Sequence, residues 1–522
     1  MDRINGSPIY PIGEQSFKEI REAGKVYVDK TAFIPILLRN KFHFLSRPRR
    51  FGKSLFLSTL EYFFLGRREL FKGLTIDSYD WDWKEYPVIR INLGEGSYSK
   101  DFGLEERLNE ILEDYEIKYD IQTSGMSPRA RFRSLLKSLN RIFDRQVVIL
   151  IDEYEKPLLD TIEMPHFQRY QDELADFYSV LKNNEENIKL LFITGVTRFG
   201  HLNIFSGFNN LKDISLKEEY SAICGITQGE LTSYFKDGIK VFAKANEVDF
   251  NAALDKLKTH YDGYHFSRLL IDVYNPFSVL DCLESKRITS IWFQSGSSRY
   301  LLNNLKKNNY DLTDLEGVEA SEDILKGVDA SMKDSVTLLY QSGYLTIKNF
   351  NPESEQYTLG LPNFEVKRAL YSVIIPYYLG AKYNNATPEA YSFIEMLKDG
   401  KAEEAMKWLQ GYFSGISQDV KLDYESEFQQ VVYAFFALSG QLSGATLEKK
   451  TSNGRIDMIY ETERFVYVFE FKRGKDPQVA IDQINSKQYG LQWQADKRTV
   501  IKIGVAFSPE TRGIAGFVIE NS

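Results

Sequence analysis

The chain has 522 residues, 43% of them hydrophobic and 26% charged, which is typical of a globular protein of about two to four domains. A net charge of −8 excludes a surface that is basic throughout, so a nucleic-acid site would have to be a local groove. The N-terminus has no apolar signal core, no apolar run is long enough to span a membrane, and Cys224 and Cys282 lie far apart, which predicts a cytoplasmic protein without disulfides.

Residues from about 25 to 215 alternate short apolar runs with longer segments of helical periodicity, which is typical of a parallel α/β sheet. We therefore predict one α/β domain over residues 1–215. The apolar runs expected to form its buried strands are 42–46, 86–93, 146–152 and 188–195.

The first of these strands runs into "RPRRFGKSL", which ends in the Gly52-Lys53-Ser54 of a phosphate-binding loop. The glycine that normally opens such a loop is here Arg47, and a bare G-K-[ST] arises by chance in roughly one of four chains of this length. The context favours the loop, because a strand precedes it and an apolar helical pattern follows it. Lys53 would then neutralise the β- and γ-phosphates, and Ser54 would bind Mg²⁺.

Two later strands end in polar residues. The run "VVILIDEYEKP" places Asp152 where it could bind the metal and Glu153 where it could polarise a water, although a solvated acidic strand end is the simpler reading. In "LLFITGVTRFG", Thr194 and Arg198 hold positions from which a polar sensor and a cation could reach a γ-phosphate. A purely structural role for Arg198 is the alternative.

The rest of the chain, residues 216–522, predicts a different organisation. We expect a helical lid over residues 216–350, because its last stretch, "VTLLYQSGYLTIKNF", indicates a helix, a glycine turn and a strand like the wing of a winged helix. A helical connection is expected over residues 351–415, and a separate α/β domain over residues 416–522.

Residues 455–473 predict a hairpin with charged residues on one face. Glu470 and Lys472 are two apart and share a face, and a turn centred on Thr462–Glu463 would pair Asp457 with Val468, leaving Glu470 diagonal to Asp457. Two carboxylates can hold Mg²⁺, and a lysine can position the attacking water or stabilise the phosphate. A hairpin with a solvated charged face is the alternative.

Segments on both sides of the hairpin add to this pattern. The preceding helix has an apolar stripe on which Glu425 falls, which makes Glu425 a third candidate metal ligand. A helix after the hairpin offers Gln483 and Tyr489 as candidate contacts to nucleic acid. The order of these elements resembles that of PD-(D/E)XK nucleases.

Six ordered motifs resemble the AAA-ATPase-like family of bacterial proteins, which typically carry a PD-(D/E)XK-type nuclease domain at the C-terminus. They are "YVDKT" at 27–31, "RPRRFGKSL" at 47–55, "ILIDEYEKP" at 149–157, "FITGVTRFG" at 192–200, "YDGYHF" at 261–266 and "NPFSVL" at 275–280. In this family "RPRRFGKS" takes the place of the standard phosphate loop. The resemblance implies nucleotide contacts from Arg49, Arg50, Phe51, Gly52, Lys53, Ser54 and Leu55. Whether Arg47, Arg49 or Arg50 contacts phosphate or only decorates the loop is left open at this point.

Together these features predict a P-loop NTPase-type parallel-sheet domain, a helical and winged-helix-like lid, and a restriction-endonuclease-like α/β domain. The implied cofactors are ATP and Mg²⁺, and the implied partner is nucleic acid, DNA rather than RNA, with no membrane and with a homo-oligomer left open. The function predicted first is an ATPase fused to a Mg²⁺-dependent nuclease that acts in defence or DNA processing. An ATP-switched scaffold that binds nucleic acid without cleaving it, and a nuclease whose P-loop fold is only structural, are the alternatives.

Overall fold

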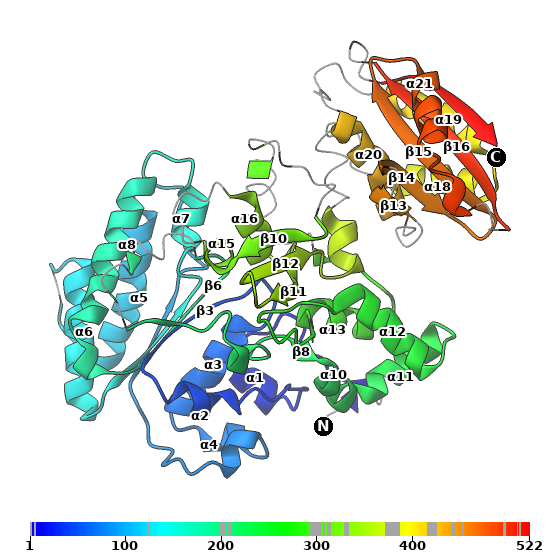
Figure 1. Ribbon diagram of the computed structural model, residues 1–522. Helices are drawn as coiled ribbons and strands as arrows, with labels where there is room; N and C mark the ends of the chain where they lie inside the picture. Colours follow the sequence, from blue (N-terminus) through cyan, green and yellow to red (C-terminus); the bar gives the residue numbers. More distant parts are fainter. Residues whose placement is uncertain are drawn as a thin grey trace. The chain divides into compact units, whose positions relative to one another are not determined.

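In the computed structural model the chain forms two compact units (Figure 1). The first comprises residues 1–289, 299–304 and 316–363, and the second residues 290–298, 305–315 and 364–522. The structure describes residues 3–4, 7–123, 125–198, 204–205, 208, 210–292, 304–305, 308, 310, 315–327, 334–370, 387–414, 425–439, 445–451, 454–493, 497–508, 510 and 513–521.

A five-stranded parallel sheet of order β4-β5-β6-β3-β7 lies at the centre of the first unit. Its strands other than β7 are buried along almost their whole length, which explains why they appear as continuous apolar runs. The bounds are β3 (Phe42–Ser46), β4 (Val88–Asn92), β5 (Val147–Asp152), β6 (Ile188–Gly195) and β7 (Lys212–Asp213). The four predicted strands are thus confirmed, and β6 lies between β3 and β5.

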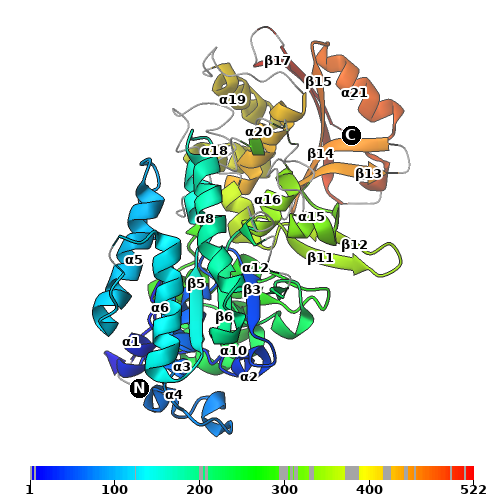
Figure 2. The same cartoon turned by 90° about the vertical axis from the view of Figure 1, so that its left-hand side faces the viewer.

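Helices cover both faces of this sheet (Figures 1 and 2). The apolar stripes of α5 (Gly103–Tyr119), α6 (Pro128–Phe143) and α8 (Phe167–Lys182) form one continuous core with the strands. Helix α3 (Lys53–Phe64), which follows the candidate phosphate loop, packs on the other face together with α1. The shorter elements are β1 (Arg3–Ile4), β2 (Ser7–Pro8), α1 (Phe17–Glu22), α2 (Phe33–Leu37), α4 (Arg68–Phe71) and α7 (Lys156–Thr161).

A group of helices follows the parallel sheet and shares one apolar core. Its elements are β8 (Ile226–Thr227), α10 (Gln228–Tyr234), α11 (Lys236–Ala245), α12 (Phe250–Tyr261), β9 (Val273–Tyr274) and α13 (Pro276–Ser285). Short connections between amphipathic helices favour this arrangement, because each helix can bury its apolar stripe against the next one.

A small antiparallel sheet of order β10-β12-β11 completes the first unit. With two short helices it forms the predicted winged-helix-like element: β10 (Val318–Ser321), α15 (Glu322–Lys326), α16 (Ser335–Gln341), β11 (Thr346–Asn351) and β12 (Gln356–Gly360). The predicted boundary at residue 350 cuts this sheet, because β11 and β12 form a hairpin. The segment 351–415, predicted as a helical connection, therefore begins with a strand.

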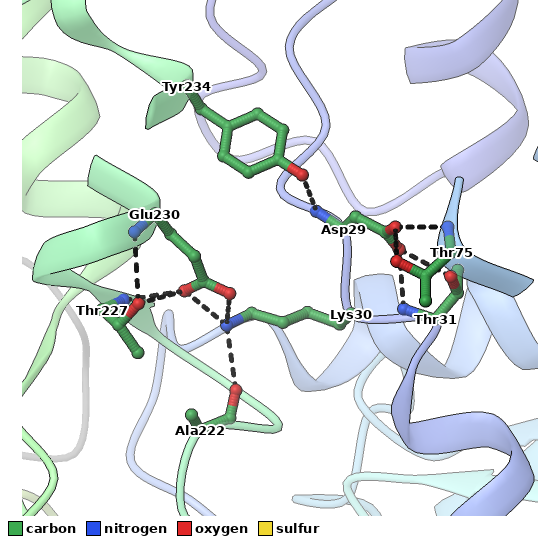
Figure 3. A network of polar contacts seen from close by, with 8 residues as sticks. All are labelled: Asp29, Lys30, Thr31, Thr75, Ala222, Thr227, Glu230 and Tyr234. Atoms are coloured by element: carbon green, nitrogen blue, oxygen red, sulfur yellow. Dashed lines mark hydrogen bonds and ion pairs between the residues drawn. The ribbon is translucent and has the colours of Figure 1, made fainter. Parts of the chain in front are cut away.

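The "YVDKT" motif joins the N-terminal segment to two distant parts of the unit (Figure 3). The Lys30 ammonium donates to both carboxylate oxygens of Glu230 at 2.7 Å and to the carbonyl oxygen of Ala222 at 2.9 Å. The Asp29 carboxylate accepts hydrogen bonds from the backbone N–H and hydroxyl of Thr75, both at 2.7 Å. The side chains of Asp29 and Lys30 thus both connect separate parts of the fold. Lys30 is only 8% exposed, and a lysine buried to this extent needs a paired charge.

The second unit is built on a mixed sheet of order β13-β14-β15-β16-β17, in which only the β15–β16 pair is parallel. Its strands are β13 (Ala445–Thr451), β14 (Gly454–Glu461), β15 (Phe465–Arg473), β16 (Thr499–Phe507) and β17 (Ile514–Asn521). Its helices are α18 (Thr387–Lys398), α19 (Ala402–Ser414), α20 (Glu425–Leu438) and α21 (Pro477–Ser486). Helix α21 forms the crossover between the two parallel strands.

The hairpin of β14 and β15 has a different register from the one predicted. Ile459, not Asp457, lies opposite Val468, because the backbone N–H of Thr462 donates to the carbonyl of Phe465 at 2.8 Å. The turn is thus centred one residue later than predicted, which moves the pairing by two residues. A shift of two keeps every side chain on its face, so the predicted clustering of charged groups is unaffected.

The predicted fold class is confirmed in both units. None of the helices in the described ranges is long and apolar enough to cross a bilayer. Cys224 and Cys282 are both buried, and neither forms a disulfide among the described residues.

Candidate functional site

The candidate phosphate loop connects β3 to α3. Gly52 caps α3 with φ = 94°, a left-handed conformation that favours glycine, and Arg50 is also left-handed at φ = 65°. The Lys53 ammonium folds back and donates to the carbonyl oxygens of Arg47 at 2.8 Å and Pro48 at 2.9 Å. The lysine of the predicted triplet is therefore held by the backbone of the loop that precedes it.

Lys53 is almost completely buried, and burial lowers the pKa of its ammonium, while the carboxylates of Asp152 and Glu155 act in the opposite sense. Both carboxylates therefore lie close enough to stabilise the charged form of the lysine. Asp152, at the end of β5, accepts a hydrogen bond of 2.6 Å from the hydroxyl of Thr194, at the end of β6. The structure thus brings Lys53, Asp152 and Thr194 together, because β6 separates β3 from β5 and the carboxyl ends of all three strands meet.

Arg47, which replaces the usual glycine, is a structural residue of the loop. It is 1% exposed, and its guanidinium donates to the carbonyl oxygens of Ser46 at 2.9 Å, Ser215 at 2.7 Å and Tyr220 at 3.0 Å. Burial lowers the pKa of Arg47 to about 10, so the side chain stays charged at neutral pH. It ties the loop to the chain that follows β7.

The other predicted loop residues lie on the same turn. Arg49, Arg50, Ser54 and Leu55 are half-buried, and Phe51 is buried. Their contacts to a nucleotide stay predictions.

The side chains of Glu153 and Arg198 contact other parts of the first unit. Glu153 has φ = 52°, and its carboxylate reaches toward β4, since one of its oxygens would lie 2.8 Å from a Cβ built on Gly94. Arg198 is ion-paired to Asp213 on β7 at 2.6 Å, and its backbone N–H donates to the Gln341 side chain at 3.0 Å. A role for Arg198 as a phosphate sensor would require it to leave Asp213.

Glu155 is a residue of the site that the sequence reasoning missed. It is 2% exposed, and one carboxylate oxygen accepts the backbone N–H groups of Val196 at 2.5 Å and Thr197 at 3.2 Å. It thereby fixes the segment that follows Thr194. In the sequence, Glu155 is the third carboxylate of "DEYE". This pattern looks like part of an exposed acidic turn and does not indicate a buried side chain.

The second site lies at one end of the hairpin in the other unit. Glu470 is fully buried, and one of its oxygens accepts hydrogen bonds from the Lys472 ammonium, at 2.8 Å, and from the Gln483 amide. Asp457 is 9% exposed, and its carboxylate accepts the backbone N–H of Phe471 at 2.8 Å. The structure thus places four of the predicted residues, Asp457, Glu470, Lys472 and Gln483, in one cluster.

Tyr489 lies beside this cluster. Its hydroxyl donates to the carbonyl of Arg455 at 2.9 Å, and burial together with the charge of Glu470 raises its pKa. Gly454 leaves the space for it, because a Cβ there would lie 2.8 Å from the Tyr489 hydroxyl. Glu425 is the first residue of α20, and its side chain lies outside the described residues.

The chemistry of the donors fits a hard divalent cation at this cluster. Asp457 and Glu470 are carboxylates on one face of the hairpin, and Mg²⁺ is commonly held by one or two carboxylates with water completing its shell. Over the described ranges, no group of three or more His, Cys, Asp or Glu residues is placed to hold a metal. The two carboxylates are therefore the protein's described contribution.

Known protein families match both the N-terminal and the C-terminal part of the chain. A family described as predicted AAA-ATPase matches residues 11–205, and one described as PD-(D/E)XK nuclease superfamily matches residues 423–516. A protein of Azotobacter chroococcum mcd 1, described as an uncharacterized protein in the vnfD 5′ region, is 34% identical over 526 aligned residues, 98% of each chain. The ORC2 protein of Aeropyrum pernix, solved as ADPNP–ADP complexes, aligns over 64% of this chain and 88% of its own, with 12% identity and a TM-score of 0.26, too low to support an argument.

Fold and sites together define a P-loop-type domain joined to a nuclease-like domain. The chain belongs to the AAA-ATPase-like family whose members carry a C-terminal PD-(D/E)XK nuclease superfamily domain. An AAA-ATPase-like domain implies nucleotide binding, and a nuclease-type domain implies interaction with nucleic acid.

Glu155 yields a test of the electrostatics at the nucleotide site. Burial raises its pKa from 4.5 to about 7, so between these pH values the folded protein holds a proton that the unfolded chain has lost. The unfolding free energy of the wild type, relative to Glu155→Gln, should therefore fall by about 3 kcal/mol as the pH rises through this window, and level off above it. Urea unfolding over this pH range measures the difference, with the exposed Glu163→Gln as the matched control. A difference that does not change with pH would contradict the buried placement.

Proposed function

We propose that this protein binds and hydrolyses ATP in its N-terminal domain and cleaves nucleic-acid phosphodiester bonds, with Mg²⁺, in its C-terminal domain. The observation that carries the nuclease half is the full burial of Glu470 between Lys472 and Gln483. Burying a carboxylate costs roughly several kcal/mol of desolvation free energy. A carboxylate on a solvated hairpin face would not carry this cost. The two domains are proposed to occupy residues 1–215 and 416–522.

The nucleotide half rests on the position of Lys53. Its ammonium donates to two loop carbonyls, Arg47 and Pro48, and a phosphate oxygen is a stronger acceptor for a cation than a carbonyl. Backbone N–H groups at the start of α3 would complete the cradle, with Ser54 and Asp152 as the Mg²⁺ ligands. Glu153 would orient the attacking water, and Thr194, which already bonds Asp152, would hold that carboxylate in place.

In the nuclease half each residue has a distinct task. Asp457 and Glu470 would hold Mg²⁺, which when bound neutralises phosphate charge and makes water more acidic. Lys472 lies on the same face, 2.8 Å from Glu470, where its ammonium can position the attacking water and stabilise charge on the phosphate. Gln483 keeps the Glu470 carboxylate in one orientation. Together these roles describe hydrolysis of a phosphodiester, with DNA proposed before RNA as substrate, and defence or DNA processing as the setting.

The nucleotide site is tested by Lys53→Ala. Removing the cation should weaken ATP binding by about 30-fold or more, corresponding to about 2 kcal/mol for the loss of a buried charge contact. Calorimetric titration with ATP and Mg²⁺ measures it, and Lys84→Ala, which removes an exposed lysine from the same domain, is the matched control. ATP binding by a folded Lys53→Ala protein with wild-type affinity would disprove the phosphate loop.

The nuclease site is tested by Asp457→Asn and Glu470→Gln. Each keeps the shape of the side chain but removes a charge that the cation needs, so Mg²⁺-dependent cleavage of labelled DNA should fall by about 100-fold or more. Asp482→Asn, an exposed change on α21, is the control and should cleave like the wild type.

Cleavage that persists in the double Asp457→Asn, Glu470→Gln protein would place the activity elsewhere. A wild-type protein that binds DNA tightly but never cleaves it, with Mg²⁺ and ATP present, would instead favour the ATP-switched scaffold.

A further inference from the structure

The phosphate loop is in contact with two motifs of the helical part, "YDGYHF" and "NPFSVL", that the proposed chemistry does not use. The Arg47 guanidinium lies over the ring of Phe266, 4.2 Å from its centroid. The ring of Phe51 packs edge-on against Tyr264 and Phe266, with centroid distances of 4.8 and 5.3 Å. One motif therefore contacts the loop both at its start and next to Gly52.

The second motif contacts the middle of the loop. The Arg50 guanidinium lies 4.2 Å from the centroid of the Phe277 ring, which follows the Asn275-Pro276 start of α13. Outside both motifs, the backbone N–H of Gly225 donates to the carbonyl of Phe51 at 3.0 Å. Residues 47, 50 and 51 are thus each held from outside the loop.

This arrangement answers a conformational need of the sequence. A glycine-rich loop takes up left-handed angles without strain, but here Arg50 adopts φ = 65°. A non-glycine residue keeps such a conformation only where its surroundings enforce it. The contact between the Arg50 guanidinium and the face of the Phe277 ring can enforce this conformation. It is attractive, and it fixes the direction of a long and otherwise flexible side chain.

The same brace sets the position of the lysine. Lys53 is held by the carbonyls of Arg47 and Pro48, and Arg47 is in turn held by Phe266 and by the carbonyls of Ser215 and Tyr220. A change in the path of residues 47–51 would therefore move the carbonyls around the lysine. The rings and the phosphate-binding groups are linked through side chains and backbone that are in direct contact.

We propose that Phe266 and Phe277 are positioning residues of the nucleotide site, which act through the guanidinium groups of Arg47 and Arg50 to hold the glycine-poor loop in its phosphate-binding shape. The inference rests on the proposed nucleotide-binding function of this loop. It assigns to the two lid motifs the task that flexible glycines perform in an ordinary phosphate loop.

Phe277 is the better position for the test, because its ring is half-buried and a change there disturbs the core less than one at Phe266. Replacing it with mono-, di- and trifluorophenylalanine weakens the negative face of the ring at nearly constant size. ATP affinity should fall stepwise along this series and by about fivefold in Phe277→Leu. Phe277→Tyr, which keeps an electron-rich ring, should bind ATP with the wild-type affinity. A residue that only fills space would not follow the electronic character of the ring.

Hydrogen exchange of the loop amides, measured without nucleotide, is the second readout. Exchange over residues 47–53 should speed up in the same order as the ATP affinity falls. Phe242→Leu is the matched control, because Phe242 is buried in the core of the same helices and makes none of the ring contacts described above. It should leave both the loop exchange and the ATP affinity at wild-type values.

The outcomes separate this inference from the proposed function. Unchanged loop exchange across the Phe277 series, or faster exchange with unchanged ATP affinity, would overturn the positioning role. A wild-type protein that binds no ATP would refute the proposed nucleotide function, and the exchange data would then show by themselves whether the rings hold the loop.

Discussion

The buried guanidinium of Arg47 makes the interactions on which the shape of the candidate nucleotide site depends. The guanidinium donates to the carbonyls of Ser215 and Tyr220, and the backbone carbonyl of Arg47 accepts a hydrogen bond from the Lys53 ammonium. A single residue thereby joins the phosphate loop to the chain beyond the parallel sheet and positions the lysine. An arginine in place of glycine makes the loop less adaptable, and it also makes the shape of the loop dependent on the helices that follow the sheet.

The nuclease-like site is organised by a different constraint, the burial of one charged group. Glu470 is fully buried, so it needs Lys472 and Gln483 as partners, and the hairpin and α21 must keep their relative positions to supply them. The fold therefore holds the candidate metal ligands in place before any cation binds. Both sites follow one principle: a costly buried polar group is stabilised by residues that come from several elements.

Local patterns predicted the parts of these sites that lie close together in the sequence. The strand and helix on either side of Gly52-Lys53-Ser54 could be predicted, as could the shared face of Glu470 and Lys472, because period and spacing are local properties. The roles of Arg47 and Glu155 could not, since their hydrogen-bond partners are backbone groups that lie far along the chain. The hairpin register failed for a third reason: the choice between two adjacent turn centres depends on the hydrogen bond made by Thr462.

The central claim is that the loop from Arg47 to Lys53 holds the phosphates of a nucleotide in a shape that is fixed beforehand. The most direct measurement is a crystal structure of the wild-type chain with Mg²⁺ and a non-hydrolysable ATP analogue. The Lys53 ammonium should have left the carbonyls of Arg47 and Pro48 for the phosphate oxygens, while the Arg47 guanidinium stays on Ser215 and Tyr220. A triphosphate bound away from this loop, or a loop that rearranges so that Arg47 itself turns out to the phosphates, would contradict the account.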